Sequence, residues 1–363
     1  MKILCFIDLL GSGGAQRQIV NLAVEFKKKG DDVRFIVYHP DKFYKSKLAE
    51  NNIEVELIRE ANAIVRILKI RKYIRNGSFD VVISFLETPN LIAEIAGLPV
   101  KKWRLLVGER SSNPKILTSF KSKFLRYMHL FADAIITNSE TNLAMIKKIN
   151  PFLSEKKCHT IYNMVDLEIW RPSDNYKVRK NGKTNIIIVA SHQYLKNSRN
   201  LIEALNLLSA VEKSLLLIKW FGGPSPDNSY CDSKELISHY KLNHIIEFLP
   251  PMMNIADEMA DADCCALFSF YEGLPNTICE GMTLGKPIIA TCVSDLPRII
   301  DEGLGGYLCD TGSPESIAAC IRKILFTSNE QLIAMGKYNR AKAVSLFNKE
   351  EIVNSYLRIL QNA

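Results

Sequence analysis

The stretch at residues 269–291, SFYEGLPNTICEGMTLGKPIIAT, decides the fold that we expect for this chain. A short apolar run at 264–268 precedes it and predicts a buried strand, and the apolar residues at 287–291 predict a second one. Between them lie a loop with Gly and Pro, a short helix from about Asn276, and Gly285. A strand, a helix and a strand in this order build a parallel α/β sheet.

Two acidic residues in this stretch, Glu272 in the loop and Glu280 on the helix, indicate a ligand site. The loop between them offers backbone N–H groups at a helix N-terminus, and such groups bind anions. Carboxylates beside an anion site suit a ligand with both phosphates and hydroxyls, such as a sugar nucleotide. Two structural alternatives stay open: Glu280 could complete a capping box with Thr277, and Glu272 could be an exposed loop acid.

The rest of the chain repeats the same alternation of strands and helices in two series. The first series ends before a polar stretch at 171–184, and the second begins with a strand at 185–190. Residues 1–170 and 171–346 are therefore expected to form two Rossmann-like, doubly wound α/β domains with parallel sheets. The two domains would face each other across a cleft lined by the carboxyl ends of the strands.

The composition is that of a globular protein. Of the 363 residues, 47% are hydrophobic and 24% charged, and no apolar run reaches the ~18–20 residues that span a bilayer. Nine cysteines are scattered without a C-x-x-C pair, which indicates reduced thiols in a cytoplasmic protein. Residues 1–165 carry 27 Lys and Arg against 16 Asp and Glu, a net charge of +11, whereas residues 166–363 carry 20 against 23, a net charge of −3. The first half is therefore expected to face something anionic.

Two segments of the basic half combine lysine and arginine with apolar residues, at 61–75 and 115–128, and the second overlaps a single helix that the pattern predicts over about 117–131. Charged helix faces of this kind are usually only solvated. Two of them in one half also fit a peripheral contact with an anionic membrane, at the cytoplasmic face of the inner membrane. No aromatic-basic module and no zinc motif in the sequence supports a nucleic-acid partner.

Two further features, a glycine-rich loop and a lysine, each follow a predicted strand at a place suited to binding a phosphate. The loop GSGG at 11–14 follows the first strand and can bring backbone N–H groups close to a phosphate, or it is simply a tight turn. It is not a dinucleotide fingerprint, because Gln16 stands in place of the third glycine. Lys196 follows the first strand of the second series, where a cation suits a diphosphate, although a lone loop lysine is usually solvated.

The triplet Asp261-Ala262-Asp263 matches the D-x-D pattern of metal-dependent sugar transferases of a different fold. Here it ends a predicted helix and enters a buried strand. We therefore expect these aspartates to be structural, and we expect no metal or other cofactor to be required.

Taken together, these residues resemble the retaining glycosyltransferases of family 4, which have the two-domain GT-B fold. The segments EGLPNTICEGM at 272–282 and GKPIIAT at 285–291 are similar to that family's E-x7-E segment and the strand after it. Weaker similarities occur in the same order at 13–17, 137–140, 161–166 and 196–197. The resemblance is to members that build bacterial surface polysaccharides, and it implies that the last helix, about 347–363, packs back on the N-terminal domain.

The resemblance implies a role for each matching residue. Glu280 would hold the ribose hydroxyls, Glu272 would contact the transferred sugar, and Lys196 would neutralise the leaving diphosphate. Gly13 and Gly14 would close on the diphosphate from the other domain. The backbone of the loop and helix start would line the diphosphate and the sugar through Gly273, Leu274, Pro275, Asn276 and Thr277.

The sequence departs from the family pattern near the donor. Ser191 stands where family members usually have an arginine, so more of the diphosphate charge falls on Lys196, with help from Arg199. Pro250 stands in place of a frequent glycine near the nucleotide base.

A third departure lies in the N-terminal half, where Glu109 and Arg110 occupy the place in which many members have a histidine. Arg110 and Arg17 are expected on the acceptor side. The domain at 1–170, with the last helix, would hold the acceptor, and the domain at 171–346 would hold the donor.

The function expected from this resemblance is retaining, metal-independent transfer of a sugar from a nucleoside diphosphate sugar, with a UDP-sugar as donor. The acceptor would be a hydroxyl of a glycan or of a polyprenyl-diphosphate-linked oligosaccharide. Two alternatives stay open: a sugar-nucleotide epimerase or phosphorylase of the same fold, and a non-catalytic sugar-nucleotide-binding protein.

Overall fold

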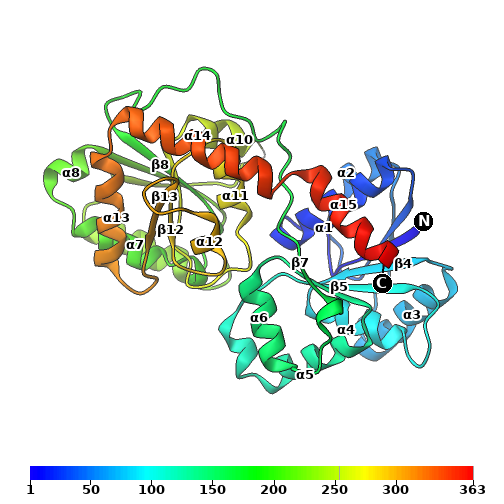
Figure 1. Cartoon of the computed structure of the whole chain (residues 1–363). Coiled ribbons are helices and arrows are strands. Elements are labelled where there is room, and N and C mark those ends of the chain that lie inside the picture. Colours follow the sequence, from blue (N-terminus) through cyan, green and yellow to red (C-terminus); the bar gives the residue numbers. More distant parts are fainter. Residues whose placement is uncertain (253, 363) are drawn as a thin grey trace. The chain divides into compact units, whose positions relative to one another are not determined.

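The computed structural model describes residues 1–252 and 254–362, and it divides into two compact units. Unit 1 consists of Met1–Met164 and Lys349–Ala363, and unit 2 of Val165–Asn348. In Figure 1, unit 1 is coloured blue to green, and the red helix α15 (Lys349–Asn362) returns to it beside α1 (Gly14–Lys28).

The boundary between the units lies a few residues before the one expected at residues 170 and 171. The backbone N–H of Val165 donates to the carbonyl of Phe347 at 3.0 Å, so the chain enters and leaves unit 2 at neighbouring points. The C-terminal helix, expected over about 347–363, begins at Lys349, and residue 363 lies outside the described part of the chain.

The strands described in unit 1 form one parallel sheet in the order β3-β2-β1-β4-β5-β6-β7. Successive residues of β1 point to opposite faces, so Ile3 and Cys5 enter the core beneath α1 and α15, and Leu4 and Phe6 enter the core on the other face. The strands are β1 (Lys2–Phe6), β2 (Asp32–Val37), β3 (Glu54–Leu57), β4 (Val81–Phe85), β5 (Arg104–Glu109), β6 (Ala134–Thr137) and β7 (Cys158–Thr160).

Helices cover both faces of this sheet. Helices α3, α4, α5 and α6 pack in sequence against one another, whereas α1 packs against α15. The remaining helical segments of unit 1 are α2 (Lys45–Glu50), α3 (Ala63–Asn76), α4 (Glu87–Ala96), η1 (Pro114–Leu117), α5 (Phe120–Met128), η2 (His129–Phe131), α6 (Glu140–Ile149) and η3 (Glu155–Lys157).

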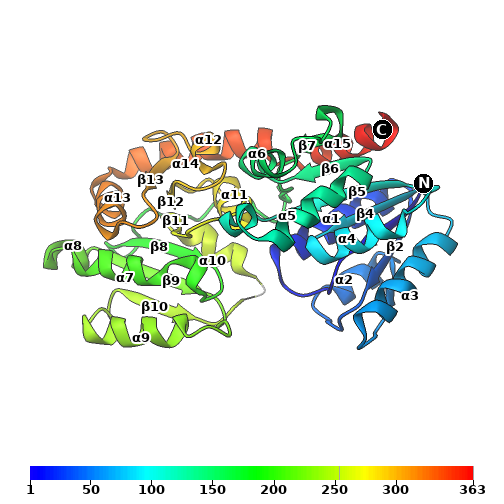
Figure 2. The same cartoon turned by 90° about the horizontal axis from the view of Figure 1, so that it is seen from below.

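The strands described in unit 2 form a second parallel sheet, in the order β10-β9-β8-β11-β12-β13, which can be followed in Figure 2. These strands are β8 (Thr184–Val189), β9 (Leu216–Phe221), β10 (Ile246–Leu249), β11 (Cys264–Leu267), β12 (Ile288–Thr291) and β13 (Gly306–Cys309). The expectation of two α/β domains with parallel sheets is confirmed.

Helix α7 packs between α9 and α13, and α11 packs against α14. The helical segments of unit 2 are η4 (Tyr194–Lys196), α7 (Ser198–Asn206), α8 (Ala210–Ser214), α9 (Ser229–His239), α10 (Ile255–Asp261), α11 (Asn276–Thr283), α12 (Leu296–Ile299), α13 (Pro314–Phe326) and α14 (Asn329–Leu346).

Differences from the expected elements are concentrated in short segments. The sequence pattern did not indicate α2, α8, α12 or β7, which are too short to show a period. The single helix expected over 117–131 is divided, because Ser119 interrupts it and caps α5, its side chain accepting from the backbone N–H of Ser122 at 3.3 Å. Among the described helices, none is both long and apolar enough to cross a membrane.

Candidate active site in unit 2

The site lies where the strand order of unit 2 reverses. Strand β8 pairs with β9 on one side and with β11 on the other, so the connections that follow β8 and β11 leave in opposite directions. In parallel α/β sheets, ligands bind at the carboxyl ends of the strands at such a point. Lys196 follows β8, and Glu272 follows β11.

The structure brings Lys196 and Glu272 into direct contact. The Nζ of Lys196 lies 2.5 Å from Oε1 of Glu272, and the side chains are 17% and 13% exposed. The loops that carry them are joined as well, because the backbone N–H of Phe270 donates to the carbonyl of Leu195 at 2.9 Å. The ring of Phe270 also stacks on that of Tyr194, with centroids 5.1 Å apart. The lysine is therefore held in place beside the acidic loop.

Hydroxyl groups fix the shape of the acidic loop. Ser269 donates to Oε1 of Glu272 at 2.6 Å, and Thr291, at the end of β12, donates to the carbonyl of Ser269 at 2.6 Å. Ser294 donates to the carbonyl of Gly273. No sequence pattern indicated these supporting hydroxyls, because a serine or threonine hydroxyl becomes informative only when its acceptor is known.

Helix α11 begins directly after this loop. Its N-cap is Pro275, and no side chain caps it. The hydroxyl of Thr277 donates instead to the carbonyl of Val189, the last residue of β8, at 2.8 Å. The capping-box alternative for Thr277 and Glu280 is therefore wrong. The first turn of α11 presents the positive end of the helix dipole at the edge of the sheet, as an anion site requires.

Glu280 lies in the middle of α11 and is only 4% exposed. Its neighbour Gly281 lets the helix lie close to the sheet, because a Cβ there would come within 2.8 Å of the Cβ of Cys265 on β11. Gly273, Leu274 and Pro275 are buried in the loop before the helix.

Asn276 and Thr277 are half-buried at the helix start. The predicted donor-binding residues from Gly273 to Glu280 thus form one continuous segment around the start of α11. Their contacts with a ligand stay a prediction.

Arg199 follows Lys196 by three residues, and its predicted help with the diphosphate stays a prediction. It is exposed in the first turn of α7, and its charge acts on the phenol of Tyr240, which hydrogen-bonds Glu203. Ser191, which replaces the usual arginine, accepts a hydrogen bond from the side chain of Gln193 at 2.6 Å. Lys196 is therefore the cation that the structure places against Glu272.

Of the two aspartates of the D-x-D pattern, Asp263 has a structural role. Asp261 ends α10 and is exposed. Asp263 is buried and accepts hydrogen bonds from the Tyr176 hydroxyl and the backbone N–H groups of Arg179 and Asn185, at 2.8–2.9 Å. Asp263 thereby ties the polar stretch at 171–183 to the sheet of unit 2.

The remaining predicted residues lie in unit 1. Gly13 is the N-cap of α1 and Gly14 its first residue, at the point where the order of the first sheet reverses between β1 and β4. Arg17 follows in the first turn and is half-buried. Arg110, just after β5, lies over the ring of Phe85 at 3.9 Å and donates to the hydroxyl of Tyr356 on α15 at 2.5 Å. Its acceptor-side role stays a prediction.

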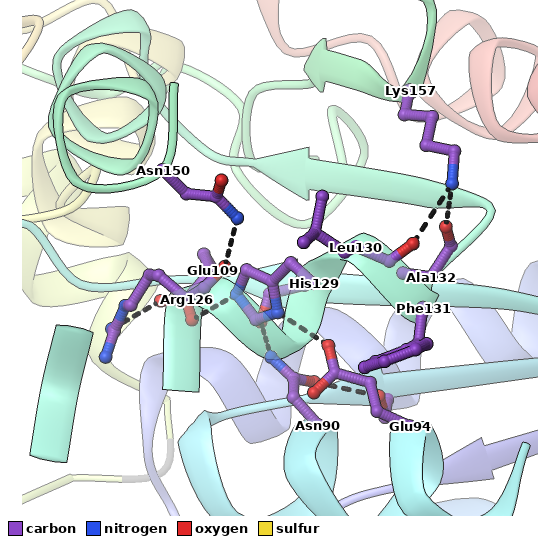
Figure 3. A network of polar contacts seen from close by, with 12 residues as sticks. Asn90, Glu94, Glu109, Arg126, His129, Leu130, Phe131, Ala132, Asn150 and Lys157 are labelled. Carbon is purple, nitrogen blue, oxygen red and sulfur yellow. Dashed lines mark hydrogen bonds and ion pairs between the residues drawn. The ribbon is translucent and has the colours of Figure 1, made fainter. Parts of the chain in front are cut away.

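Unit 1 also contains a buried ionic network that the sequence did not reveal (Figure 3). His129 contacts Glu94 through Nδ1 at 2.6 Å and Glu109 through Nε2 at 3.1 Å. Arg126 donates to Oε2 of Glu109 at 2.8 Å and also pairs with Glu87. The cations are both 1% exposed. The network joins glutamates on α4 and β5 to Arg126 on α5 and His129 in η2. Because its members are spread from residue 87 to residue 129, no local spacing predicted it.

The protonation of this network follows from burial and pairing. Burial alone would lower the pKa of His129, but the two carboxylates outweigh it and raise the pKa to about 9. Burial raises the pKa of Glu94, which competes with His129 for one proton. Burial also acts to raise the pKa of Glu109, yet hydrogen bonds from His129 and the charge of Arg126 bring it below its ordinary value. The charged Glu109 therefore favours the imidazolium form of His129.

Comparisons with known proteins agree with this geometry. Residues 12–169 match the family model described as "Glycosyltransferase Family 4", and residues 183–326 match the one described as "Glycosyl transferases group 1". The first region contains β2 to β7 of unit 1, and the second contains β8 to β13 of unit 2.

Among curated relatives, the chain is 25% identical to an N-acetylgalactosamine-N,N'-diacetylbacillosaminyl-diphospho-undecaprenol 4-alpha-N-acetylgalactosaminyltransferase of Campylobacter jejuni, over 99% of both chains. It is 26% identical to the N-acetyl-alpha-D-glucosaminyl L-malate synthase of Bacillus anthracis, over 55% of this chain and 52% of that relative. The matched segment thus spans about half the length of the second relative.

Solved structures share the whole fold. The Anabaena protein HepE, crystallised with UDP-glucose, superimposes with a TM-score of 0.88 at 17% identity, covering 100% of both chains. The lipopolysaccharide outer core galactosyltransferase WaaB superimposes with a TM-score of 0.76 at 15% identity, covering 99% of both chains. With both halves matched by family models and the two parallel sheets in place, the chain belongs to family 4 of the glycosyltransferases and has the GT-B fold.

Proposed function

We propose that this glycosyltransferase moves a sugar from a UDP-sugar to a lipid-linked oligosaccharide or glycan hydroxyl, with retention of the anomeric configuration. The observation that carries the proposal is the contact between Lys196 and Glu272 beside the first turn of α11, at the reversal point of the second sheet. A cation, a carboxylate and helix N–H groups in one place suit a diphosphate that carries a sugar.

Each group has a defined task in the proposed reaction. The bond between the anomeric carbon and the β-phosphate oxygen breaks, and negative charge accumulates on the departing diphosphate. Lys196 and the N–H groups at the start of α11 stabilise that charge. The acceptor oxygen bonds to the anomeric carbon on the same face, and its proton passes to the departing phosphate oxygen. Glu272 orients Lys196 and accepts hydrogen bonds from sugar hydroxyls, and no side chain acts as a nucleophile.

The relatives support the choice of donor and acceptor class. The HepE crystal contains UDP-glucose, and the Campylobacter jejuni relative is named for a diphospho-undecaprenol acceptor. Unit 1 contains the basic half of the chain, which suits the phosphates of such an acceptor. We therefore assign the donor to unit 2 and the acceptor to unit 1.

The test is a panel of UDP-sugars, with nucleotide release measured in the presence of bacterial membrane lipid extract as acceptor. One donor is expected to release UDP only when the extract is present, and the NMR coupling of the product should report the same anomer as the donor. Conversion of the donor without acceptor would indicate an epimerase instead. Tight binding without turnover on any acceptor would indicate a binding protein.

Glu280→Ala should abolish donor binding in titration calorimetry with UDP, because the proposed ribose contact is lost. The matched control is Glu247→Ala, an exposed glutamate on β10 of the same sheet, which should bind UDP normally.

Activity after exhaustive treatment with a chelator should be unchanged, since Lys196 and helix N–H groups take the place of a metal ion. A loss that added Mg²⁺ or Mn²⁺ restores would contradict metal independence.

A further inference from the structure

Helix α5 has an unusual distribution of side chains. Its aromatic residues face solvent, with Phe120 86% exposed, Phe124 51% and Tyr127 40%. Its arginine, Arg126, is buried, and so is His129 directly after it. A helix on the surface of a globular protein normally does the reverse and hides its apolar face.

The exposed apolar side chains form one stripe. Phe120, Phe124, Tyr127 and Phe131 are spaced four, three and four residues apart, which places them on the same face of a helix. Phe131 and its neighbour Leu130, in the turn η2, are exposed too. At about 100° per residue, Lys121 and Lys123 fall on either side of this stripe.

The buried network fixes the helix in this orientation. For α5 to turn its aromatic side chains inward, Arg126 would have to leave Glu87 and Glu109, and His129 would have to leave Glu94 and Glu109. Breaking a buried ion pair in this way is strongly unfavourable.

The end of the helix is held as well (Figure 3). Lys157 donates to the carbonyls of Leu130 and Ala132, and Lys101 donates to that of Phe131. The outward stripe is thus a fixed feature of unit 1.

The other basic helix of unit 1, α3, differs in how its cations are used. Arg71 donates to the carbonyl of Leu98 at 2.8 Å, and Arg75 donates to that of Ala96 at 3.0 Å. Arg66 lies over the ring of Tyr38, and Lys69 pairs with Glu60. These cations hold α3 on its own unit.

The lysines beside the aromatic stripe, and Lys115 in η1 just before α5, are in a different situation. Among the described residues, no carboxylate lies within ion-pair distance of Lys115, Lys121 or Lys123, and all three are exposed. Their charge remains available to a partner.

We propose that the aromatic stripe of α5, with Lys115, Lys121 and Lys123, docks unit 1 on an anionic lipid bilayer. Aromatic side chains settle at the level of the lipid headgroups, and lysines next to them attract anionic lipids. The docking surface adds to the proposed function and rests on it in one respect, because a lipid-linked acceptor would be presented at a membrane surface.

The experiment measures binding of the full chain to sedimented vesicles, without donor or acceptor. Vesicles of equimolar phosphatidylglycerol and phosphatidylcholine should bind the protein at least about tenfold more tightly than vesicles of phosphatidylcholine alone, and added salt should weaken this preference. The variant Phe120→Ser/Phe124→Ser/Tyr127→Ser should lose at least about tenfold in binding to the anionic vesicles. Lys121→Glu/Lys123→Glu should lose a similar factor, with most of the loss removed at high salt.

The matched control is Ile64→Ser/Leu68→Ser, which removes two exposed apolar side chains from α3 in the same unit. This variant should bind like the wild type. Loss of binding in the α3 variant with normal binding in the α5 variants would overturn the proposal. So would a wild-type protein that ignores anionic vesicles, or one that instead forms dimers that the α5 triple variant abolishes.

The outcome is separable from that of the proposed reaction. Vesicle binding requires no turnover, so it can succeed even if no donor is found. If transfer occurs, the α5 triple variant should lose activity on acceptor in vesicles and keep it on acceptor dissolved in detergent. Thermal unfolding of the variant should match that of the wild type, because serine replaces side chains that are already exposed.

Discussion

Two groups of paired charges, one in each unit, use similar residues under opposite conditions. In unit 1, His129 and Arg126 lie between carboxylates and are almost fully buried. In unit 2, Lys196 pairs with Glu272 at the edge of the sheet, where both side chains keep contact with solvent. Buried pairs are costly to break, whereas partly exposed ones exchange partners readily.

This difference in burial separates charges that hold the fold in place from charges that can act on a ligand. A charge that has several fixed partners and no access to solvent can hold a helix in place, but it cannot meet a ligand. A lysine with one carboxylate at an open edge can transfer part of its attraction to an incoming diphosphate. The following variants test this division, from the largest expected effect to the smallest.

Glu109→Ala should destabilise the protein most, by about 3–5 kcal/mol, because it leaves two buried cations with one carboxylate each. Chemical denaturation monitored by circular dichroism gives the free energy of unfolding. The matched variant in unit 2 is Glu272→Ala, which should change that free energy by less than about 1 kcal/mol. Equal destabilisation by both variants would break the comparison.

Lys196→Ala should lower the turnover number about 100- to 1,000-fold, equivalent to about 3–4 kcal/mol of lost transition-state stabilisation. Its stability should stay close to that of the wild type. Lys219→Ala is the control, because Lys219 pairs with Glu258 in the same unit at 3.0 Å but lies away from the reversal point of the sheet. Full activity of Lys196→Ala would remove this lysine from the site.

The pKa of His129, raised to about 9, makes stability depend on pH. The folded protein holds the proton more tightly than the unfolded chain, whose histidine pKa is about 6.5. The stabilisation is therefore complete below pH of about 6.5 and declines by a few kcal/mol as pH rises through about 9. Unfolding free energies across this range should show the decline in the wild type and lack it in His129→Gln. A flat wild-type profile would show that His129 is neutral.

Asp263→Asn should lower the free energy of unfolding by only about 1–2 kcal/mol. The amide keeps one oxygen acceptor, but its NH2 group faces backbone N–H or hydroxyl donors. Transfer activity should be unchanged. Asp261→Asn, at an exposed position, should alter neither property. Loss of activity in both variants, restored by a divalent cation, would return the D-x-D pattern to a catalytic role.

Much of the fold could be predicted because it depends on local pattern. The alternation of apolar strands and helices indicated both parallel sheets, and Gly285 marked the turn after α11, where φ is +70°. The short elements α2, α8 and β7 were not predicted, because a few residues carry no reliable hydrophobic period. The division of the expected helix at 117–131 escaped too, because Ser119 acts as a cap only once its backbone partner is in place.

The candidate site was predictable in its members but not in its contacts. The sequence singled out Lys196, Glu272 and Glu280, yet it left open whether Glu280 belonged to a capping box with Thr277. The structure decided this through a hydrogen bond from Thr277 to Val189, which is 88 residues away in the chain. The sequence also proposed that Arg199 helps Lys196 with the diphosphate charge, and this role stays a prediction, since Arg199 lies near Tyr240 at the start of α7.

The sequence by itself determined the class of fold, the loop at 269–291 and the identity of the charged residues that follow strands. These depend on periodicity and on residues near one another in the chain. Only the tertiary structure decided that Lys196 meets Glu272, 76 residues later, and that α5 buries Arg126 while Phe120 faces solvent. The reason is that strand order and the carboxylates of distant elements select which side of a helix or loop turns inward, and no local pattern records that choice.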